Sequence, residues 1–108
     1  AYDELILVAN RDSLEDPKLR RFIDGLEAGV QFLVNHPDES WQLFIAGERQ
    51  ELDDELNRRA WRDTLPRFAL RPGALDRTRY QRFAEFLKDQ DIIKEIAPLE
   101  SWAVELER

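Results

Sequence analysis

The sequence contains no cysteine, and this absence excludes two ways in which a small protein is commonly held together or made reactive. Without Cys there is no disulfide framework, and no thiolate is available as a nucleophile. An apolar core must therefore stabilise the fold. The 108 residues are long enough to form such a core, and we expect them to form one domain.

Basic charge and long apolar runs are also scarce. The chain has 16 Lys and Arg against 23 Asp and Glu, for a formal net charge of −7. This balance argues against nucleic acid or an anionic membrane as a partner, because both need a basic surface. No apolar run approaches the roughly 20 residues that cross a bilayer. No signal peptide is visible, and the first residue is not Met, so we expect a fragment of a longer protein.

The longest amphipathic stretch covers residues 17–35. We expect the other elements of the chain to cover its apolar face. We expect Asp16 to cap this helix and Pro17 to occupy its first turn, where a missing N–H costs nothing. Gly25 and Gly29 are unfavourable inside a helix, and we expect a neighbouring backbone to approach them closely. The apolar positions follow helical spacing: Leu19, Phe22, Ile23, Leu26, Val30, Leu33 and Val34.

A short apolar run from Leu5 to Ala9 reads LILVA and is typical of a strand buried on both faces. No second strand is apparent, and a buried strand cannot leave its backbone groups unpaired. We therefore expect that residues 5–9 either pair with another copy of the chain, giving a homo-oligomer, or belong to a sheet in absent sequence.

The rest of the chain predicts four further helices, so the expected fold class is mainly α with one short strand. Their expected ranges are 37–46, 52–64, 76–88 and 91–97, with caps expected at Asp76 and Asp91. Nine side chains are expected to be largely buried: Phe22, Leu26, Val30, Leu33, Phe44, Leu56, Trp61, Phe83 and Leu87.

Each residue or motif that could form a catalytic or metal-binding site also has a purely structural interpretation. His36, the single histidine, lies at the end of the first helix, where it could bond a free carbonyl. The acidic run 51–55 lacks the ligand pattern of a calcium loop and indicates a helix start with pairs from Asp54 to Arg58 and Glu55 to Arg59. No phosphate loop or metal-ligand spacing is present. We therefore expect no catalytic, cofactor or metal site and no enzymatic activity.

The three tryptophans could stack on a planar ligand, but each also lies on an apolar face at helical spacing. They are Trp41, Trp61 and Trp102. Core packing is the favoured interpretation for each of them.

Several motifs resemble one known family, the substrate-binding proteins of ABC transporters for thiamine pyrimidine precursors, which is related to the fungal thiamine-pyrimidine synthases. The matching motifs are YDELILVAN at 2–10, NHPDESW at 35–41, ELNRRAW at 55–61, TLPRFA at 64–69, RYQRFA at 79–84 and IIKE at 92–95. The resemblance implies a C-terminal fragment of a two-lobed α/β periplasmic-binding-protein fold. Most ligand contacts would then lie in absent sequence, and Tyr2 and Trp61 are the candidate contacts within this chain.

The resemblance leaves three classes of function open. The first is capture of an aminopyrimidine thiamine precursor for an ABC permease, at a periplasmic or extracytoplasmic location. The second is a thiamine-pyrimidine synthase, in which a Lys would hold pyridoxal phosphate and a His would be consumed; Lys18, Lys88, Lys94 and His36 are available. The third is a helical interaction module without a small ligand. The resemblance favours capture.

Overall fold

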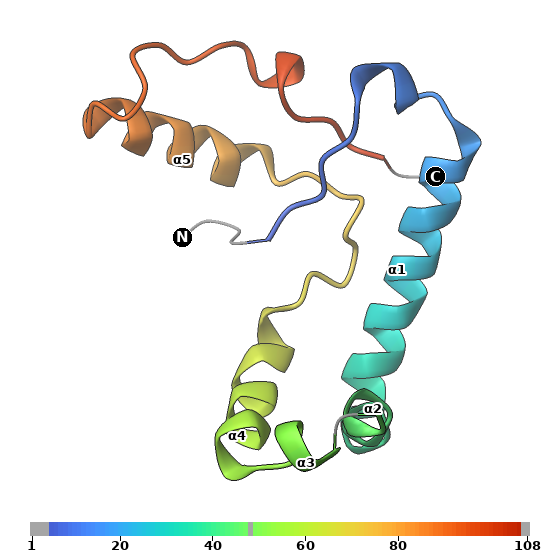
Figure 1. The fold of residues 1–108 in the computed structure, drawn as a ribbon. Helices are drawn as coiled ribbons and strands as arrows, with labels where there is room; N and C mark the ends of the chain where they lie inside the picture. Colours follow the sequence, from blue (N-terminus) through green and yellow to red (C-terminus); the bar gives the residue numbers. More distant parts are fainter. Residues whose placement is uncertain (1–4, 48, 107–108) are drawn as a thin grey trace. The chain divides into compact units, whose positions relative to one another are not determined.

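The computed structural model describes residues 5–47 and 49–106, which form helices joined by loops (Figure 1). The α-helices are α1 (Pro17–Asn35), α2 (Pro37–Ile45), α3 (Arg49–Leu52), α4 (Glu55–Thr64) and α5 (Arg77–Asp89), and the 3-10 helices are η1 (Arg11–Ser13), η2 (Leu65–Arg67) and η3 (Leu99–Ser101). No helix in this described part is long and apolar enough to cross a membrane. The mainly helical fold class is confirmed.

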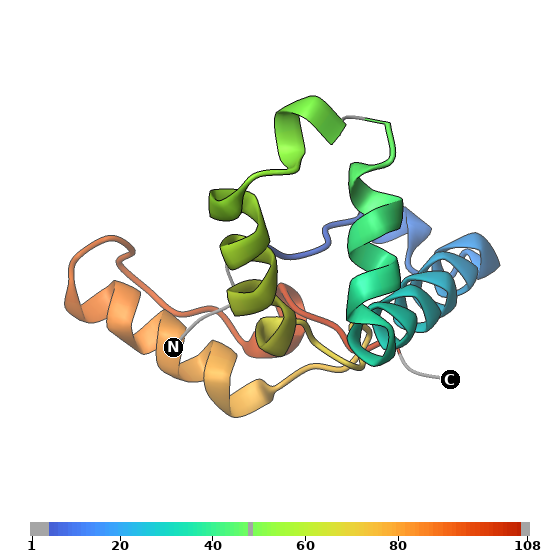
Figure 2. The same cartoon turned by 90° about the horizontal axis from the view of Figure 1, so that it is seen from below.

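The chain divides into two compact units. The terminal unit consists of residues 1–20 and 73–108, and the second unit consists of residues 21–72. Within the terminal unit, the segment that follows α5 runs back alongside that helix (Figure 2). The Leu106 N–H donates to the Gly73 carbonyl at 2.9 Å, and the Arg11 guanidinium donates to the Ser101 carbonyl at 3.2 Å.

Helix α1 has the predicted bounds and the predicted start. The Lys18 N–H donates to the Asp16 carboxylate at 2.9 Å, which confirms Asp16 as the cap. Ile23 and Val30 are the buried residues of this helix. The close approach expected at Gly25 and Gly29 is wrong, because a Cβ built on either would meet nothing within 4 Å.

In the 21–72 unit, the expected single helix over 52–64 is wrong at its beginning. Asp54 adopts an extended backbone with φ −133° and ψ 172°, and its side chain accepts the Asn57 N–H. An N-cap has non-helical dihedrals, so the cap at Asp54 separates α3, which ends at Leu52, from α4. Asp54, expected inside the first turn of the predicted helix, is therefore the cap of α4, and α3 and α4 are two separate helices.

The predicted strand at residues 5–9 is also corrected, because the described residues contain no strand. Their backbone groups make no hydrogen bond to other described residues. Side chains in this segment are open to solvent, with Leu5 93% and Val8 86% exposed. The physical reason is the lack of a second strand in the described chain, since a strand needs a neighbour to form its ladder.

The fifth predicted helix, over 91–97, is replaced by a segment without regular secondary structure. Asp91 has a positive φ of 59°. Its N–H donates to the Lys88 carbonyl at 3.0 Å, and the Ile92 N–H donates to the Leu87 carbonyl at 2.9 Å. These two bonds and the left-handed residue make a Schellman motif, which terminates α5. Asp91 is therefore the C-terminal end of one helix rather than the cap of another.

The expected core is confirmed only in part. Val30 is buried, and Leu26, Leu33, Trp61, Phe83 and Leu87 are half-buried. The prediction is wrong for Phe22, Phe44 and Leu56, which are 58%, 53% and 75% exposed. Helical spacing identifies an apolar stripe, but burial requires an element that covers the whole stripe.

Candidate functional site

An apolar groove lies in the terminal unit between α5 and the segment that runs back beside it. Its volume is about 370 Å³, and α5 contributes one wall through Tyr80, Phe83 and Leu87. These residues share a face because they are spaced by three and four positions. The opposite wall is formed by the segment after α5, and Ile6 of the N-terminal segment also lines the groove.

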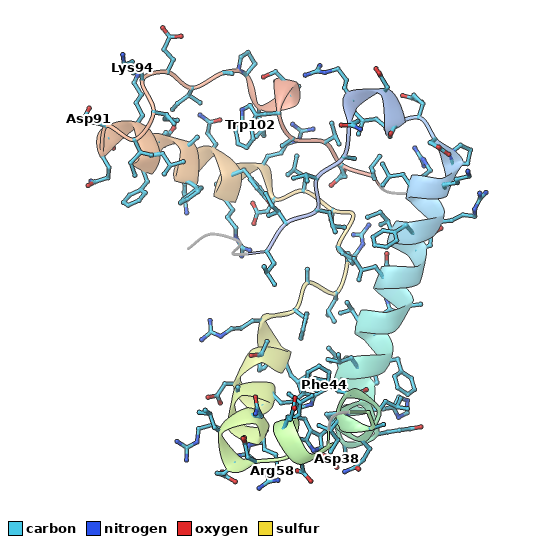
Figure 3. The ribbon with its side chains drawn as sticks, viewed as in Figure 1. Asp38, Phe44, Arg58, Asp91, Lys94 and Trp102 are labelled. Carbon is cyan, nitrogen blue, oxygen red and sulfur yellow. The ribbon has the colours of Figure 1, made fainter. Side chains whose placement is uncertain are left out.

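Two aromatic rings meet at this groove. The ring centroids of Tyr80 and Trp102 are 6.1 Å apart, with an interplanar angle of 60°. The Trp102 indole N–H donates to the Ala97 carbonyl at 3.2 Å, which fixes the ring against the returning segment. Figure 3 labels Trp102 on this segment. Trp102 nevertheless stays 45% exposed, so one side of its ring is available for contact.

The polarity of the groove limits what it can bind. Among its lining residues, Arg79 and Glu95 carry charge, and the others are predominantly apolar or aromatic. The Arg79 Nε lies 3.9 Å from an Asp76 carboxylate oxygen, so its charge has an acidic neighbour. The lining suits an apolar or planar group, and it offers no nucleophile with an adjacent general base.

Trp61, one of the two predicted ligand contacts, lies in an aromatic cluster of the 21–72 unit. Its ring centroid is 5.1 Å from that of Phe44 and 5.6 Å from that of Trp41. Trp41 is buried, and the Trp61 indole nitrogen is buried without a hydrogen-bond partner among the described residues. These contacts indicate packing between α2 and α4. Tyr2, the other candidate, lies outside the described residues, so both ligand contacts stay predictions.

His36 has the structural surroundings that the sequence suggested, although its ring makes a different contact. It is the N-cap residue of α2, and its ring centroid lies 4.7 Å from that of Phe32. Its carbonyl accepts the Ser40 N–H at 2.9 Å. The three lysines considered for a cofactor, Lys18, Lys88 and Lys94, are all exposed, and none of them lines the groove.

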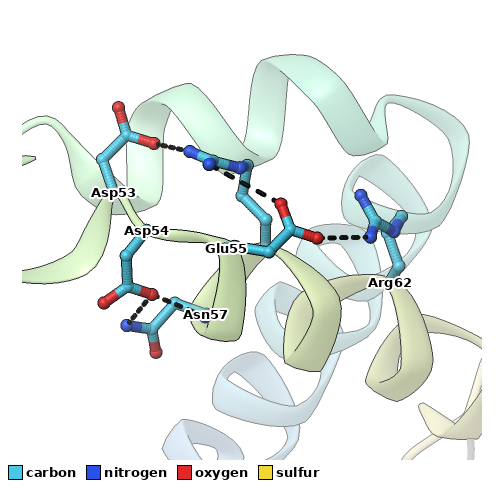
Figure 4. A network of polar contacts seen from close by, with 6 residues as sticks. Asp53, Asp54, Glu55, Asn57 and Arg62 are labelled. Carbon is cyan, nitrogen blue, oxygen red and sulfur yellow. Dashed lines mark hydrogen bonds and ion pairs between the residues drawn. The ribbon is translucent and has the colours of Figure 1, made fainter.

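The acidic run at 51–55 forms a surface ion-pair network at the start of α4 (Figure 4). The Arg58 guanidinium lies 2.6 Å from Asp53 and 3.7 Å from Glu55, and Arg62 lies 3.5 Å from Glu55. The predicted pairing of Arg58 with Asp54 is corrected, because the Asp54 carboxylate accepts from the Asn57 N–H at 2.8 Å. Glu55, expected to pair with Arg59, contacts Arg58 and Arg62 instead.

Within the described part of the chain, no cluster of three or more His, Cys, Asp or Glu could hold a metal ion. The groove was missed from the sequence because residues 91–97 were expected to be helical. Its signals were nevertheless present: the face formed by Tyr80, Phe83 and Leu87, and the isoleucines at 93 and 96.

Comparison with known proteins gives two similarities. Residues 1–40 match the model of a family described as NMT1/THI5 like. Over 107 residues the chain is 46% identical to a Haemophilus influenzae protein named "Putative thiamine biosynthesis protein"; the match covers 99% of this chain and 34% of that protein. The chain thus spans about a third of the length of the curated relative it matches. No solved structure matches the chain.

Proposed function

We propose that this chain is part of a solute-binding protein that captures a thiamine pyrimidine precursor for uptake by an ABC transporter. The observation that carries the proposal is the similarity, along nearly the whole chain, to a relative named for thiamine biosynthesis. The match of residues 1–40 to the NMT1/THI5-like model supports the same assignment. The proposed location is periplasmic or extracytoplasmic, and the proposed protein partner is an ABC permease.

The proposal places the ligand in a cleft between two lobes, to which this chain contributes only part. Small-molecule sites gain affinity by enclosing most of the ligand surface. The groove beside α5 is open on one side, and its lining has few polar groups to hold a pyrimidine edge. We therefore expect the 108-residue chain alone to bind an aminopyrimidine weakly, and the longer parent to bind it well.

The synthase alternative has less support from the described residues. It needs a Lys for pyridoxal phosphate and a His beside it. His36 packs on Phe32, and Lys88 and Lys94 are exposed. Lys18, at the start of α1, is exposed like the other two.

The test is calorimetric titration of the longer parent protein and of the 108-residue chain with an aminopyrimidine thiamine precursor and its formylated form. Saturable binding by the parent, with binding by the fragment weaker by at least about a hundredfold, would support the proposal. Parallel absorbance spectra with pyridoxal phosphate test the synthase alternative. A parent that loads this cofactor through a Lys and fails to bind the pyrimidines would contradict the proposal.

A further inference from the structure

We propose that residues 92–106, called the strap below, open and close one wall of the groove beside α5, and that the Glu105 carboxylate is the contact that holds the strap closed. Release of this contact exposes the groove while α5 stays helical. The strap, α5 and the groove all belong to the terminal unit. The proposal goes beyond the proposed function and does not depend on it.

The strap is attached at both ends of α5. It begins at the left-handed turn of Asp91, whose hydrogen bonds terminate the helix. At its other end the Leu75 N–H donates to the Glu105 carboxylate at 2.9 Å, and the Leu106 N–H donates to the Gly73 carbonyl at 2.9 Å. Both partners lie in the loop that leads into α5. The strap therefore spans the helix from its end back to its beginning.

Between these ends the strap has few contacts with other described elements. The Arg11 guanidinium donates to the Ser101 carbonyl at 3.2 Å, and the ring centroids of Tyr80 and Trp102 are 6.1 Å apart. Every strap residue is exposed or half-buried. Segments with few buried apolar contacts and exposed hydrogen bonds open locally at a low free-energy cost. The strap should therefore separate from α5 more readily than the helix unfolds.

Glu105 provides the charged contact at the far end of the strap. Among the described residues, its carboxylate has the Leu75 N–H as its hydrogen-bond partner and forms no ion pair. A hydrogen bond to an ionised acceptor is about twice as strong as a neutral one. The adjacent bond from Leu106 joins two backbone groups. Removal of the carboxylate thus leaves one neutral bond to hold this end.

Opening of the strap changes what the groove can admit. The strap contributes Ile93, Ile96 and Trp102 to the lining, and α5 contributes Phe83 and Leu87. The closed groove has a volume of about 370 Å³, near the lower end of the range of about 300–1,000 Å³ for small-molecule pockets. When the strap leaves, both apolar walls become accessible to a larger apolar molecule.

The first experiment measures amide and indole hydrogen exchange by NMR in Glu105→Ala. We expect exchange of the Leu106 amide and the Trp102 indole to accelerate by about tenfold or more, because a bond to a charged group is lost. Glu105→Gln should lie between this variant and the native chain, since its amide oxygen still accepts a hydrogen bond but is uncharged.

The matched control is Glu100→Ala, which removes the same charge from the same strap. The Glu100 side chain is exposed and makes no hydrogen bond or ion pair among the described residues, so its replacement should leave both rates nearly unchanged. Faster exchange of the Leu75 amide alone, with Leu106 and Trp102 unaffected, would overturn the proposal. The carboxylate would then hold only the loop before α5.

The second experiment measures exposure of the groove with Nile red, a neutral dye that fluoresces on apolar surfaces. Fluorescence of the bound dye should rise several-fold in Glu105→Ala and stay at the native value in Glu100→Ala. Circular dichroism of both variants should retain the helical signal. An equal rise in the two variants, no rise in either, or a loss of helix that accompanies dye binding would overturn the proposal.

Discussion

Asp91 holds a backbone conformation that is unfavourable for most side chains. Its φ of 59° lies in the left-handed region, where a Cβ approaches the following carbonyl oxygen. The Schellman bonds at the end of α5 require this conformation, and glycine usually provides it. Asp tolerates the left-handed region better than most residues, but it retains part of the strain that Gly avoids.

We predict that Asp91→Gly raises the free energy of unfolding by up to about 1 kcal/mol, because it relieves this strain. The matched control is Asp89→Gly, in the last turn of α5, which should lower the free energy of unfolding by about 0.5–1 kcal/mol. Urea denaturation followed by circular dichroism measures both. Equal destabilisation by the two substitutions would show that residue 91 is not left-handed in solution.

Helix α4 depends on one carboxylate at its N-terminus. Asp54 accepts hydrogen bonds from both the backbone N–H and the side-chain amide of Asn57, at 2.8 and 3.0 Å. The neighbouring ion pairs involve exposed side chains, with Arg58 42% and Glu55 63% exposed. Exposed ion pairs contribute little, so the cap is the stronger determinant of where α4 begins.

We predict that Asp54→Ala lowers the free energy of unfolding by about 1 kcal/mol, within the range of about 0.5–2 kcal/mol for lost caps. Asp54→Asn should lose much less, because its amide oxygen can still accept the Asn57 N–H. Thermal melts of the two variants and of the native chain give the comparison. If Asp54→Asn is as destabilising as Asp54→Ala, negative charge rather than capping is what matters at this position.

The sequence predicted elements well where local rules decide them. Asp16 with Pro17 marked the start of α1, and Asp76 marked the start of α5, because capping depends on a few neighbouring residues. Helix boundaries predicted from acidic residues are wrong where the same residue type can have two structural roles. The sequence predicts Asp54 inside the first turn of a helix and Asp91 at the cap of one, because acidic residues favour helix first turns and Asp also tolerates the left-handed backbone.

At the scale of the whole molecule, burial is unevenly distributed among the described residues. Ile23, Val30, Ser40, Trp41 and Ile45, in the 21–72 unit, are buried, whereas Ala84 is the buried residue of the terminal unit. Ile45 is completely enclosed, with an exposure of 0%. Local stability follows buried apolar contact, so we expect the 21–72 unit to open less often.

We predict that amide hydrogen exchange is slowest in α1 and α2 and faster in α5. Ile45→Ala should accelerate exchange throughout α2, since emptying a core site costs about 2–5 kcal/mol. Leu43→Ala in the same helix is the control and should change little, because Leu43 is 66% exposed. The expectation fails if both variants speed exchange equally or if α5 is the best-protected helix.

Burial at this scale could not be predicted from the sequence. The spacing of Phe22, Phe44 and Leu56 placed them correctly on apolar stripes, but a stripe does not specify what covers it. Covering depends on contacts between elements far apart in sequence. The candidate groove illustrates the same limit, because it forms only when residues 91–97 are not helical and return beside α5.

The Trp61 indole nitrogen, which has no hydrogen-bond partner among the described residues, gives an NMR signal that reports on the packing of α2 against α4. The N–H is shielded from solvent and donates to no described acceptor, whereas the Trp102 indole N–H donates to the Ala97 carbonyl. Hydrogen bonding deshields an indole proton, so the two side-chain signals should separate in a nitrogen–proton NMR spectrum. The Trp61 signal should lie upfield and exchange slowly with water. The signal that is missing from the spectrum of nitrogen-15-labelled Trp61→Phe belongs to Trp61. Loss of its slow exchange would report separation of α2 from α4.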